Sequence, residues 1–444
     1  MSTVVASFDG ERSGTAPLTW GQVNMVRASS HNPPGHFNLS RVLTPPRRAA
    51  LTPTGAAAVI ERLLRRHESL RTLFHAGPPE RQQVLGAGRL VLEQVPADGD
   101  ADLAAERLRA RLARPAFDDG AELPLRAGLV TEDGQVRRVV LVISHLAADG
   151  TAVDLLDREF RLLALRGEVR TAPGPQPLDL AAREQSEGRR LTEAAVAHWE
   201  SVFRRMPPTM FDREGPPHDP PVRRLLLTSP ALPPATRLLA AAYRVSTSTV
   251  LLAAVATMVG RWTGHDLVTI ATLVNNRFQA GHERMVTTLA QQGLFALEMT
   301  GDGFPDLIPR AWRAAMRAYR HAYYDPDVVR RVLDQVSVDR GTTVDPFCCF
   351  NDLRVDSDAV RPDAQDTAAL RAAAQAAAGD ATLTPAGALP RMHCRFCLQI
   401  GDAPGALTMR LTADTRYLPP DEMDRFLRET ERTVLAAAGC AVPV

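Results

Sequence analysis

The sequence contains no lysine, and all 52 of its basic residues are arginine. A chain without lysine has neither the Walker lysine that binds nucleotide phosphates nor the lysine that forms a Schiff base with pyridoxal phosphate. An excess of one charge is missing too, since 51 acidic residues balance the arginines to a formal net charge of +1. This balance argues against nucleic acid or an anionic membrane surface as the main partner.

Cysteine is scarce, with five residues in a chain of 444. So few thiols, in an odd number, favour a reduced cytoplasmic protein over a secreted disulfide framework. Cys394 and Cys397 form a CxxC motif beside His393, within a segment whose pattern predicts a strand. Residues three apart in a strand point to opposite faces, so we expect buried structural thiols here rather than a zinc or redox site. No bound metal is expected.

Long hydrophobic runs are also missing. The longest apolar stretch, residues 249–259, is too short to cross a bilayer and is typical of a buried helix. The first residues lack a basic start followed by an apolar stretch, so no signal peptide is expected. Hydrophobic residues make up 45% and charged residues 23% of the chain, as in an ordinary globular protein. We therefore expect a cytoplasmic location and no membrane partner.

The hydrophobic pattern mixes helices and strands in both halves of the chain. Residues 137–144 predict a buried strand, and residues 151–165 return to helical spacing. Further helices are predicted at 51–67, 191–205, 234–263, 367–378 and 420–438, and strands at 83–95, 126–130, 223–228, 267–274, 348–353, 392–400 and 407–415. A segment rich in Pro and Gly, 167–180, is predicted to link the halves, and residues 355–389 to form a mobile loop around one short helix.

The main cluster of functional side chains lies between the strand and the helix in the first half. His145 ends the strand, Asp149 follows four residues later, and Gly150 makes the turn into the helix. An imidazole titrates near pH ~6.5, so a His held in such a loop can take a proton from an attacking amine or alcohol. These residues alone allow a second interpretation, in which His145 packs in the core and Asp149 only caps the helix.

The segment SHLAADG at 144–150 resembles the HHxxxDG signature of the condensation domains of nonribosomal peptide synthetases, which share a superfamily with chloramphenicol acetyltransferase. Other segments resemble the same family in the right order over nearly the whole chain: PLTWGQVNMV (17–26), HFNLSRVL (36–43), RHESLRTLF (66–74), RPAFDDGAELPLRAGLV (114–130), DLVTIATLVNNR (266–277), LAQQGLFAL (289–297) and CFNDLR (349–354). On these motifs the chain is identified as a condensation-type acyltransferase.

The resemblance implies an α/β fold made of two chloramphenicol acetyltransferase-like lobes, at about residues 1–170 and 180–444. The lobes would form a V-shaped pseudo-dimer with the active site at their junction, and carrier-borne thioesters would enter a tunnel from opposite faces. No cofactor would be bound, because the substrate would arrive on the phosphopantetheine of an acyl or peptidyl carrier protein, or on CoA. We expect a monomer.

The resemblance also assigns roles to individual residues. His145 corresponds to the catalytic His of the signature. Asp149 corresponds to a structural Asp that pairs with the Arg of the NR segment, here Arg277. Ser144 replaces the first His, a supporting position where a hydroxyl can still donate a hydrogen bond.

Three further positions complete the expected site. The backbone N–H of Gly150, or a nearby hydroxyl, is a candidate donor to the tetrahedral oxyanion. Phe278, which follows the Arg, and Asn351 are candidates for lining the substrate tunnel. The segment LFAL departs from the family's FVNT, because it lacks the polar residues.

The expected reaction is amide formation between a carrier-bound acyl or aminoacyl group and an amine acceptor, by a stand-alone enzyme of natural-product (antibiotic) biosynthesis. Ester formation, or transfer to a free small molecule, is an alternative that the same His would support. Heterocyclisation is disfavoured because that subgroup replaces the His with Asp, while epimerisation normally occurs inside a larger synthetase. A hypothesis of another class is a degenerate relative that recruits a partner protein, which Ser144 favours and the intact His145, Asp149 and Arg277 oppose.

Overall fold

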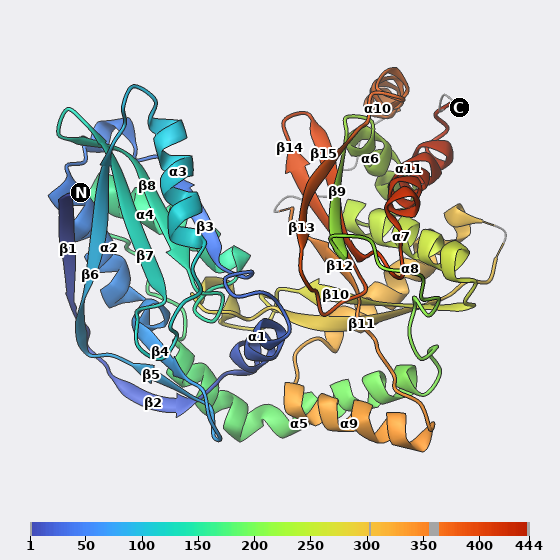
Figure 1. Cartoon of the computed structure of the whole chain (residues 1–444), viewed down its shortest axis with the longest axis horizontal. Helices are drawn as coiled ribbons and strands as arrows, with labels where there is room; N and C mark the ends of the chain where they lie inside the picture. Colours follow the sequence, from blue (N-terminus) through green and yellow to red (C-terminus); the bar gives the residue numbers. More distant parts are fainter. Residues whose placement is uncertain (1, 302, 355–363, 442–444) are drawn as a thin grey trace. The chain divides into compact units, whose positions relative to one another are not determined.

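The structure is a computed structural model that describes residues 2–301, 303–354 and 364–441 (Figure 1). The chain divides into two compact units, the first made of residues 1–190 and 275–291 and the second of residues 191–274 and 292–444. The boundary predicted at 170–180 differs from this division, because the change of unit occurs inside the 27-residue helix α5 (Pro177–Phe203). The predicted linker instead packs on the first unit, where Arg66 donates to the carbonyl of Thr171 at 2.6 Å.

A five-stranded sheet forms the centre of the first unit. Its strand order is β1-β6-β7-β8-β3, antiparallel except for the parallel pair β6 and β7. The strands are β1 (Ser2–Asp9), β3 (Leu39–Leu43), β6 (Ala87–Pro96), β7 (Leu125–Glu132) and β8 (Gln135–Ile143). A small second sheet contains β2 (Gly14–Pro17), β4 (Thr72–His75) and β5 (Arg81–Val84). The helices are α1 (Trp20–Ser30), α2 (Pro53–Arg66), α3 (Ala101–Ala113), α4 (Gly150–Arg166) and the short 3-10 turns η1 (Arg47–Ala49) and η2 (Glu68–Arg71).

Strand β8 is hydrophobic at every position of its second half because helices cover both faces of the sheet. Leu141 and Ile143 point into the cluster that contains α2 and α4, whereas Val140 and Val142 point into the cluster that contains α3. Successive side chains of a strand alternate between faces, so a continuous apolar run is what a strand buried on both sides requires. The predicted buried strand at 137–144 is therefore confirmed.

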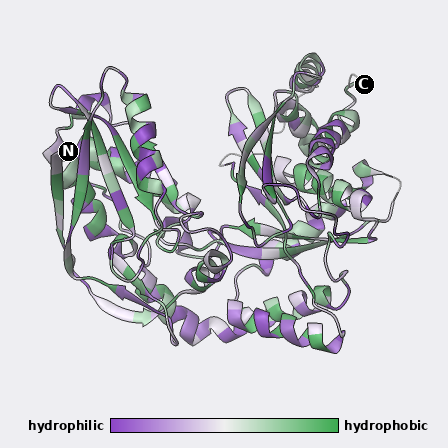
Figure 2. Cartoon of the chain, viewed as in Figure 1, coloured by the Kyte–Doolittle hydropathy of each residue, from purple (hydrophilic) through white to green (hydrophobic). Residues whose placement is uncertain are grey.

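A seven-stranded sheet forms the centre of the second unit. Its order is β11-β10-β12-β14-β15-β9-β13. The strands are β9 (Val222–Ser229), β10 (Leu267–Val274), β11 (Gln291–Glu298), β12 (Cys348–Asp352), β13 (Thr382–Leu389), β14 (Phe396–Ala403) and β15 (Ala406–Asp414). The helices are α6 (Leu232–Tyr243), α7 (Thr247–Thr263), α8 (Phe304–Arg320), α9 (Pro326–Asp339), α10 (Ala364–Ala376) and α11 (Pro420–Ala437), with η3 (His282–Arg284) in the segment that returns to the first unit. In Figure 2 hydrophilic and hydrophobic residues alternate along α9, whose apolar side joins the cluster formed with Trp199 of α5.

Two predictions for the second unit need correction, one of them only in part. The single helix predicted at 234–263 is two helices, α6 and α7, bent by 100°. Arg244 adopts a left-handed conformation with φ 56° that ends α6, and the Ser246 hydroxyl accepts from the backbone N–H of Thr249 and starts α7. The segment 355–389, predicted as a loop around one short helix, does contain that helix as α10, but it also contains the edge strand β13, which pairs antiparallel with β9 and was not predicted; residues 355–363 lie outside the described ones.

Within the described ranges, no single helix is long and apolar enough to span a membrane; α6 and α7 reach the required length and composition only as a bent pair.

Candidate active site

His145 lies in the loop that follows β8 and precedes α4, as the strand–loop–helix pattern predicts. Its side chain is half-buried, and the ring of Phe37 meets it edge-to-face at 6.3 Å between centroids. Burial lowers the pKa of His145 below its ordinary value, although the backbone carbonyls of His145 and Ala148 and the charge of Asp149 act in the opposite direction. The imidazole is therefore neutral at neutral pH, which is the form that a general base needs.

Nδ1 of His145 is buried and forms no hydrogen bond with the described residues. A proton-bearing or charged ring nitrogen without a partner is costly to bury, which agrees with the neutral form of the imidazole.

Asp149 connects the His145 loop to two other parts of the first unit. Its Oδ1 accepts from the backbone N–H of Ala152 at 2.9 Å and caps helix α4. The same oxygen accepts from Nη2 of Arg277 at 2.6 Å, and Oδ2 accepts from the backbone N–H of Leu289 at 3.0 Å. Both side chains of the ion pair are less than 10% exposed. The structure thus contains the Asp149–Arg277 pair that the resemblance implies, together with the capping role that the residues alone suggested.

Arg277 also organises its own segment, residues 275–291. Its guanidinium donates to the carbonyls of His282, Met285 and Thr287. A buried guanidinium that meets four acceptors is held in one position, since each contact is a charge-assisted hydrogen bond. Arg277 therefore ties the 275–291 segment to the loop that carries His145, and this explains why the segment belongs to the first unit despite its place in the sequence.

Ser144 anchors the other end of the His145 loop. Its hydroxyl donates to Oδ1 of Asp119 at 2.9 Å, and Oγ accepts from the backbone N–H of Leu146 at 3.4 Å. Further along the loop, the Ser69 hydroxyl donates to the carbonyl of Ala147. The loop is therefore held on both sides of His145: by the side chains of Ser144 and Asp149, and through the carbonyl of Ala147 by Ser69.

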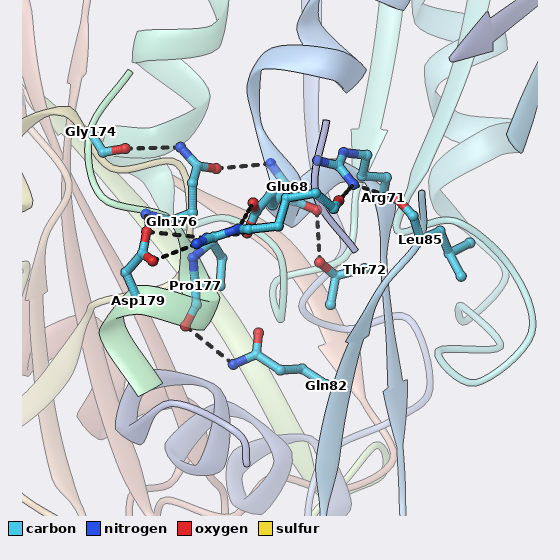
Figure 3. A network of polar contacts seen from close by, with 10 residues as sticks. Glu68, Arg71, Thr72, Gln82, Leu85, Gly174, Gln176, Pro177 and Asp179 are labelled. Atoms are coloured by element: carbon cyan, nitrogen blue, oxygen red, sulfur yellow. Dashed lines mark hydrogen bonds and ion pairs between the residues drawn. The ribbon is translucent and has the colours of Figure 1, made fainter. Parts of the chain in front are cut away.

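Ser69 is part of the RHESLRTLF segment, which a polar network holds in place (Figure 3). Arg12 donates from Nε to Glu68 at 2.6 Å and from Nη1 to Asp179 of α5 at 2.6 Å. The backbone N–H of Glu68 donates to Gln176 at 2.9 Å, and the almost fully buried Arg71 donates to the carbonyls of Arg12 and Leu85 (Figure 3). These contacts fix the turn that presents Ser69 to the His145 loop.

The remaining predicted site residues lie in different places. Gly150 is exposed at the first position of α4, and a Cβ added there would meet nothing within 4 Å. Phe278 belongs to the first unit and is 58% exposed, immediately after Arg277. Asn351 lies half-buried in β12 of the second unit, opposite Gln399 of β14. The tunnel-lining roles of Phe278 and Asn351 stay predictions.

The cysteines of the second unit are closer together than the sequence argument assumed. Cys349 of β12 is the register partner of Cys397 of β14, and hydrogen bonds link its sulfur to the thiols of Cys397 and Cys394. Cys394 lies before β14 begins, so the argument from opposite faces of a strand does not apply to it. All five cysteines are free, and the described residues contain no cluster of His, Cys, Asp or Glu arranged to hold a metal ion.

The sequence argument missed Asp119, Ser69 and Phe37 around His145. Each lies in a segment whose resemblance to the family was noted, but spacing along the chain gives no sign that these side chains meet. Ser144 was a partial indication that such a partner exists, because a hydroxyl in place of a His needs an acceptor. In the structure that acceptor is the carboxylate of Asp119.

A model of the condensation domain matches residues 13–434. The chain belongs to the condensation-domain family. It is 25% identical over 305 residues to gramicidin S synthase 2 of Brevibacillus brevis and 25% identical over 312 residues to chondramide synthase cmdD of Chondromyces crocatus, matches that cover 65% of this chain but 6% and 8% of those proteins. The chain thus spans less than a tenth of the length of these curated relatives.

Solved structures agree in fold. A structure that describes condensation domain-mediated chain release from the enacyloxin polyketide synthase superposes with a TM-score of 0.71 at 18% identity, covering 97% of this chain and 84% of that one. SgcC5 of Streptomyces globisporus superposes with a TM-score of 0.69 at 18% identity, covering 96% and 100%. The predicted α/β class with two chloramphenicol acetyltransferase-like lobes is confirmed. Condensation domains are amide-forming acyltransferases that work with carrier-bound substrates in nonribosomal peptide and polyketide synthesis.

Proposed function

We propose that this condensation domain acts as a stand-alone enzyme that joins a carrier-bound acyl or aminoacyl group to an amine and forms an amide in natural-product biosynthesis. The observation that carries the proposal is the state of His145: a neutral, half-buried imidazole in a loop held from both ends by Ser144 and Asp149. A degenerate binding domain has no need of a neutral base held in one position, whereas acyl transfer to an amine does.

His145 would act on the nucleophile. Its imidazole accepts the proton that the amine loses as the amine nitrogen attacks the thioester carbonyl. When the tetrahedral intermediate collapses, the C–S bond breaks and the C–N bond stays, and the proton passes from His145 to the departing pantetheine thiolate. Holding both reactants together contributes as well, since effective molarities of well-oriented groups reach about 10⁵–10⁸ M.

The oxyanion of the intermediate needs a donor. Helix α4 begins at Gly150, five residues after His145, and the first N–H groups of a helix have no partner within the helix. With no side chain at Gly150, a substrate oxygen can approach this N–H closely. We therefore assign oxyanion stabilisation to the start of α4.

Acyl transfer measured by intact-protein mass spectrometry tests the proposal. Donor-loaded carrier proteins encoded near this gene would be combined with a panel of amines and alcohols, using wild type and His145→Ala. Amide product with wild type and a sharp loss in the variant are expected. Formation of an ester from the alcohols would favour the alternative, in which the enzyme transfers the acyl group to a hydroxyl. If neither wild type nor His145→Ala forms product while the protein still binds a carrier, the proposal would be overturned in favour of partner recruitment.

A further inference from the structure

The loop of residues 114–124, between α3 and β7, is held in place by Arg126. Arg126 of β7 forms an ion pair with Glu122 at 2.6 Å, and its guanidinium lies 4.0 Å from the ring centroid of Phe117. The same guanidinium donates to the backbone carbonyls of Leu112, Pro115 and Ala116. One arginine thus satisfies carbonyls along the loop and holds two of its side chains, which makes the loop a rigid support.

This loop reaches His145 by two routes. Asn38 donates from one amide nitrogen to the carbonyls of Ala113 and Pro115, both at 2.8 Å, and the preceding residue, Phe37, packs its ring against His145. On the second route, Asp119 accepts from Ser144, the residue before His145. Backbone and side chain of Asp119 both take part, because its carbonyl also accepts from the N–H of Phe74 at 2.7 Å.

We propose that Asp119 is a positioning residue for the catalytic loop, and that Asp119 and Ser144 together replace the support for which the family signature uses its first His. The inference deepens the proposed function and rests on it for the role of His145. The side chain of Asp119 accepts from Ser144 and not from His145, so its effect passes through Ser144.

The hydrogen-bond capacity of Ser144 explains why an acceptor oxygen is required at position 119. A hydroxyl has one proton to donate, and here it goes to Asp119, while an oxygen lone pair accepts from the N–H of Leu146. The hydroxyl therefore transmits the position of the 114–124 loop to the backbone on both sides of His145. If Asp119 loses its acceptor oxygen, the buried hydroxyl of Ser144 is free to rotate and the start of the loop loses its anchor.

Four variants separate this role from general stability. Asp119→Ala removes the acceptor, Asp119→Asn keeps one, and Ser144→Ala removes the donor. Asp118→Ala is the matched control, because it deletes the exposed neighbouring carboxylate. We expect Asp119→Ala and Ser144→Ala each to lower kcat roughly ten- to a hundredfold with little change in KM, as loss of a hydrogen bond to a charged group predicts. The double variant should be no worse than either single one, and Asp119→Asn should restore most of the rate.

A second readout does not depend on the substrates. The pKa of His145, followed by NMR of histidine-labelled protein and assigned by the signal lost in His145→Gln, is expected to rise toward its ordinary value in Asp119→Ala and Ser144→Ala, since a loosened loop exposes the ring. It should not move in Asp119→Asn or Asp118→Ala. An unchanged His145 pKa in Asp119→Ala, or additive effects of Asp119→Ala and Ser144→Ala, would overturn the positioning role. A shifted pKa in a protein with no acyl transfer would instead keep the positioning role and reject the proposed function.

Discussion

Asp149 and Arg277 are 128 residues apart in the sequence, yet they form a buried ion pair in which one carboxylate oxygen serves the guanidinium and the N-terminus of α4 together. The pair holds the His145 loop and the returning 275–291 segment to the same point. The stability of the first unit and the position of the His145 loop therefore depend on the same contact, and we expect loss of either partner to affect both.

Arg277→Met is expected to lower the free energy of unfolding by about 3–5 kcal/mol, because it leaves the carboxylate of Asp149 buried without its counter-ion. Chemical denaturation measures this. The control is Arg330→Met in the exposed pair with Asp334 of α9, where a change below about 1 kcal/mol is expected. A similar decrease in the free energy of unfolding for both variants would show that the buried pair stabilises the fold no more than the exposed pair does.

The acid limb of the activity profile should reflect the low pKa of His145. A base is active when neutral, and burial keeps the neutral form of His145 present at lower pH than for an exposed His. We expect the single-turnover rate to stay level as pH falls to about 6.5 and to decline only below that value. The residual rate of His145→Ala should lack this limb. A decline that begins above neutral pH would contradict the assignment of His145 as a buried neutral base.

Gly150→Ala separates folding from catalysis at the start of α4. The added Cβ meets nothing within 4 Å, so we expect an unchanged or slightly higher melting temperature. If a substrate oxygen approaches the Gly150 N–H, the methyl group obstructs it, and kcat should fall while the fold stays intact. Full activity in this variant would remove Gly150 from the oxyanion site.

Stability should fall in mildly acidic solution because of His67. Burial lowers the pKa of His67, and its Nε2 lies 2.6 Å from Glu159. The unfolded chain binds a proton at His67 below about pH 6.5 whereas the folded chain does not, so the free energy of unfolding decreases as pH falls through that range, by at most about 1.4 kcal/mol per pH unit for one proton. Denaturation of His67→Gln between pH 7 and 5 should show a shallower slope, and the exposed His75→Gln should match wild type.

Cys349, Cys394 and Cys397 should react together with an oxidant. Hydrogen bonds from Cys394 and Cys397 lower the pKa of Cys349, and a thiolate is the form that attacks an oxidised partner. Treatment with diamide, a two-electron oxidant, should convert two thiols per chain into a disulfide that contains Cys349, as detected by peptide mapping. Cys349→Ser should prevent this, and Cys440→Ser should not. Oxidation that involves only Cys440 would contradict the expected reactivity.

Local features of the site could be predicted because they depend on short-range periodicity. The apolar run before His145, the helical spacing after it and the capping Asp149 all lie within about thirty residues, and the structure has β8 and α4 where the pattern placed them. The Asp149–Arg277 pair was reached only through resemblance to a family, since nothing in the spacing of the two residues indicates contact.

Other features depended on interactions that a one-dimensional pattern does not contain. Residues 234–263 form two helices because Arg244 ends α6 and Ser246 caps α7 inside an apolar stretch. Residues 382–389 form strand β13 because they pair with the edge of β9. The sequence by itself determined the family, the strand–loop–helix around His145 and the absence of lysine chemistry, since these follow from residue identity and local order. The tertiary structure alone decided that Asp119 meets Ser144 and that Cys349 meets Cys394 and Cys397, because strand order and loop path, not distance along the chain, bring those side chains together.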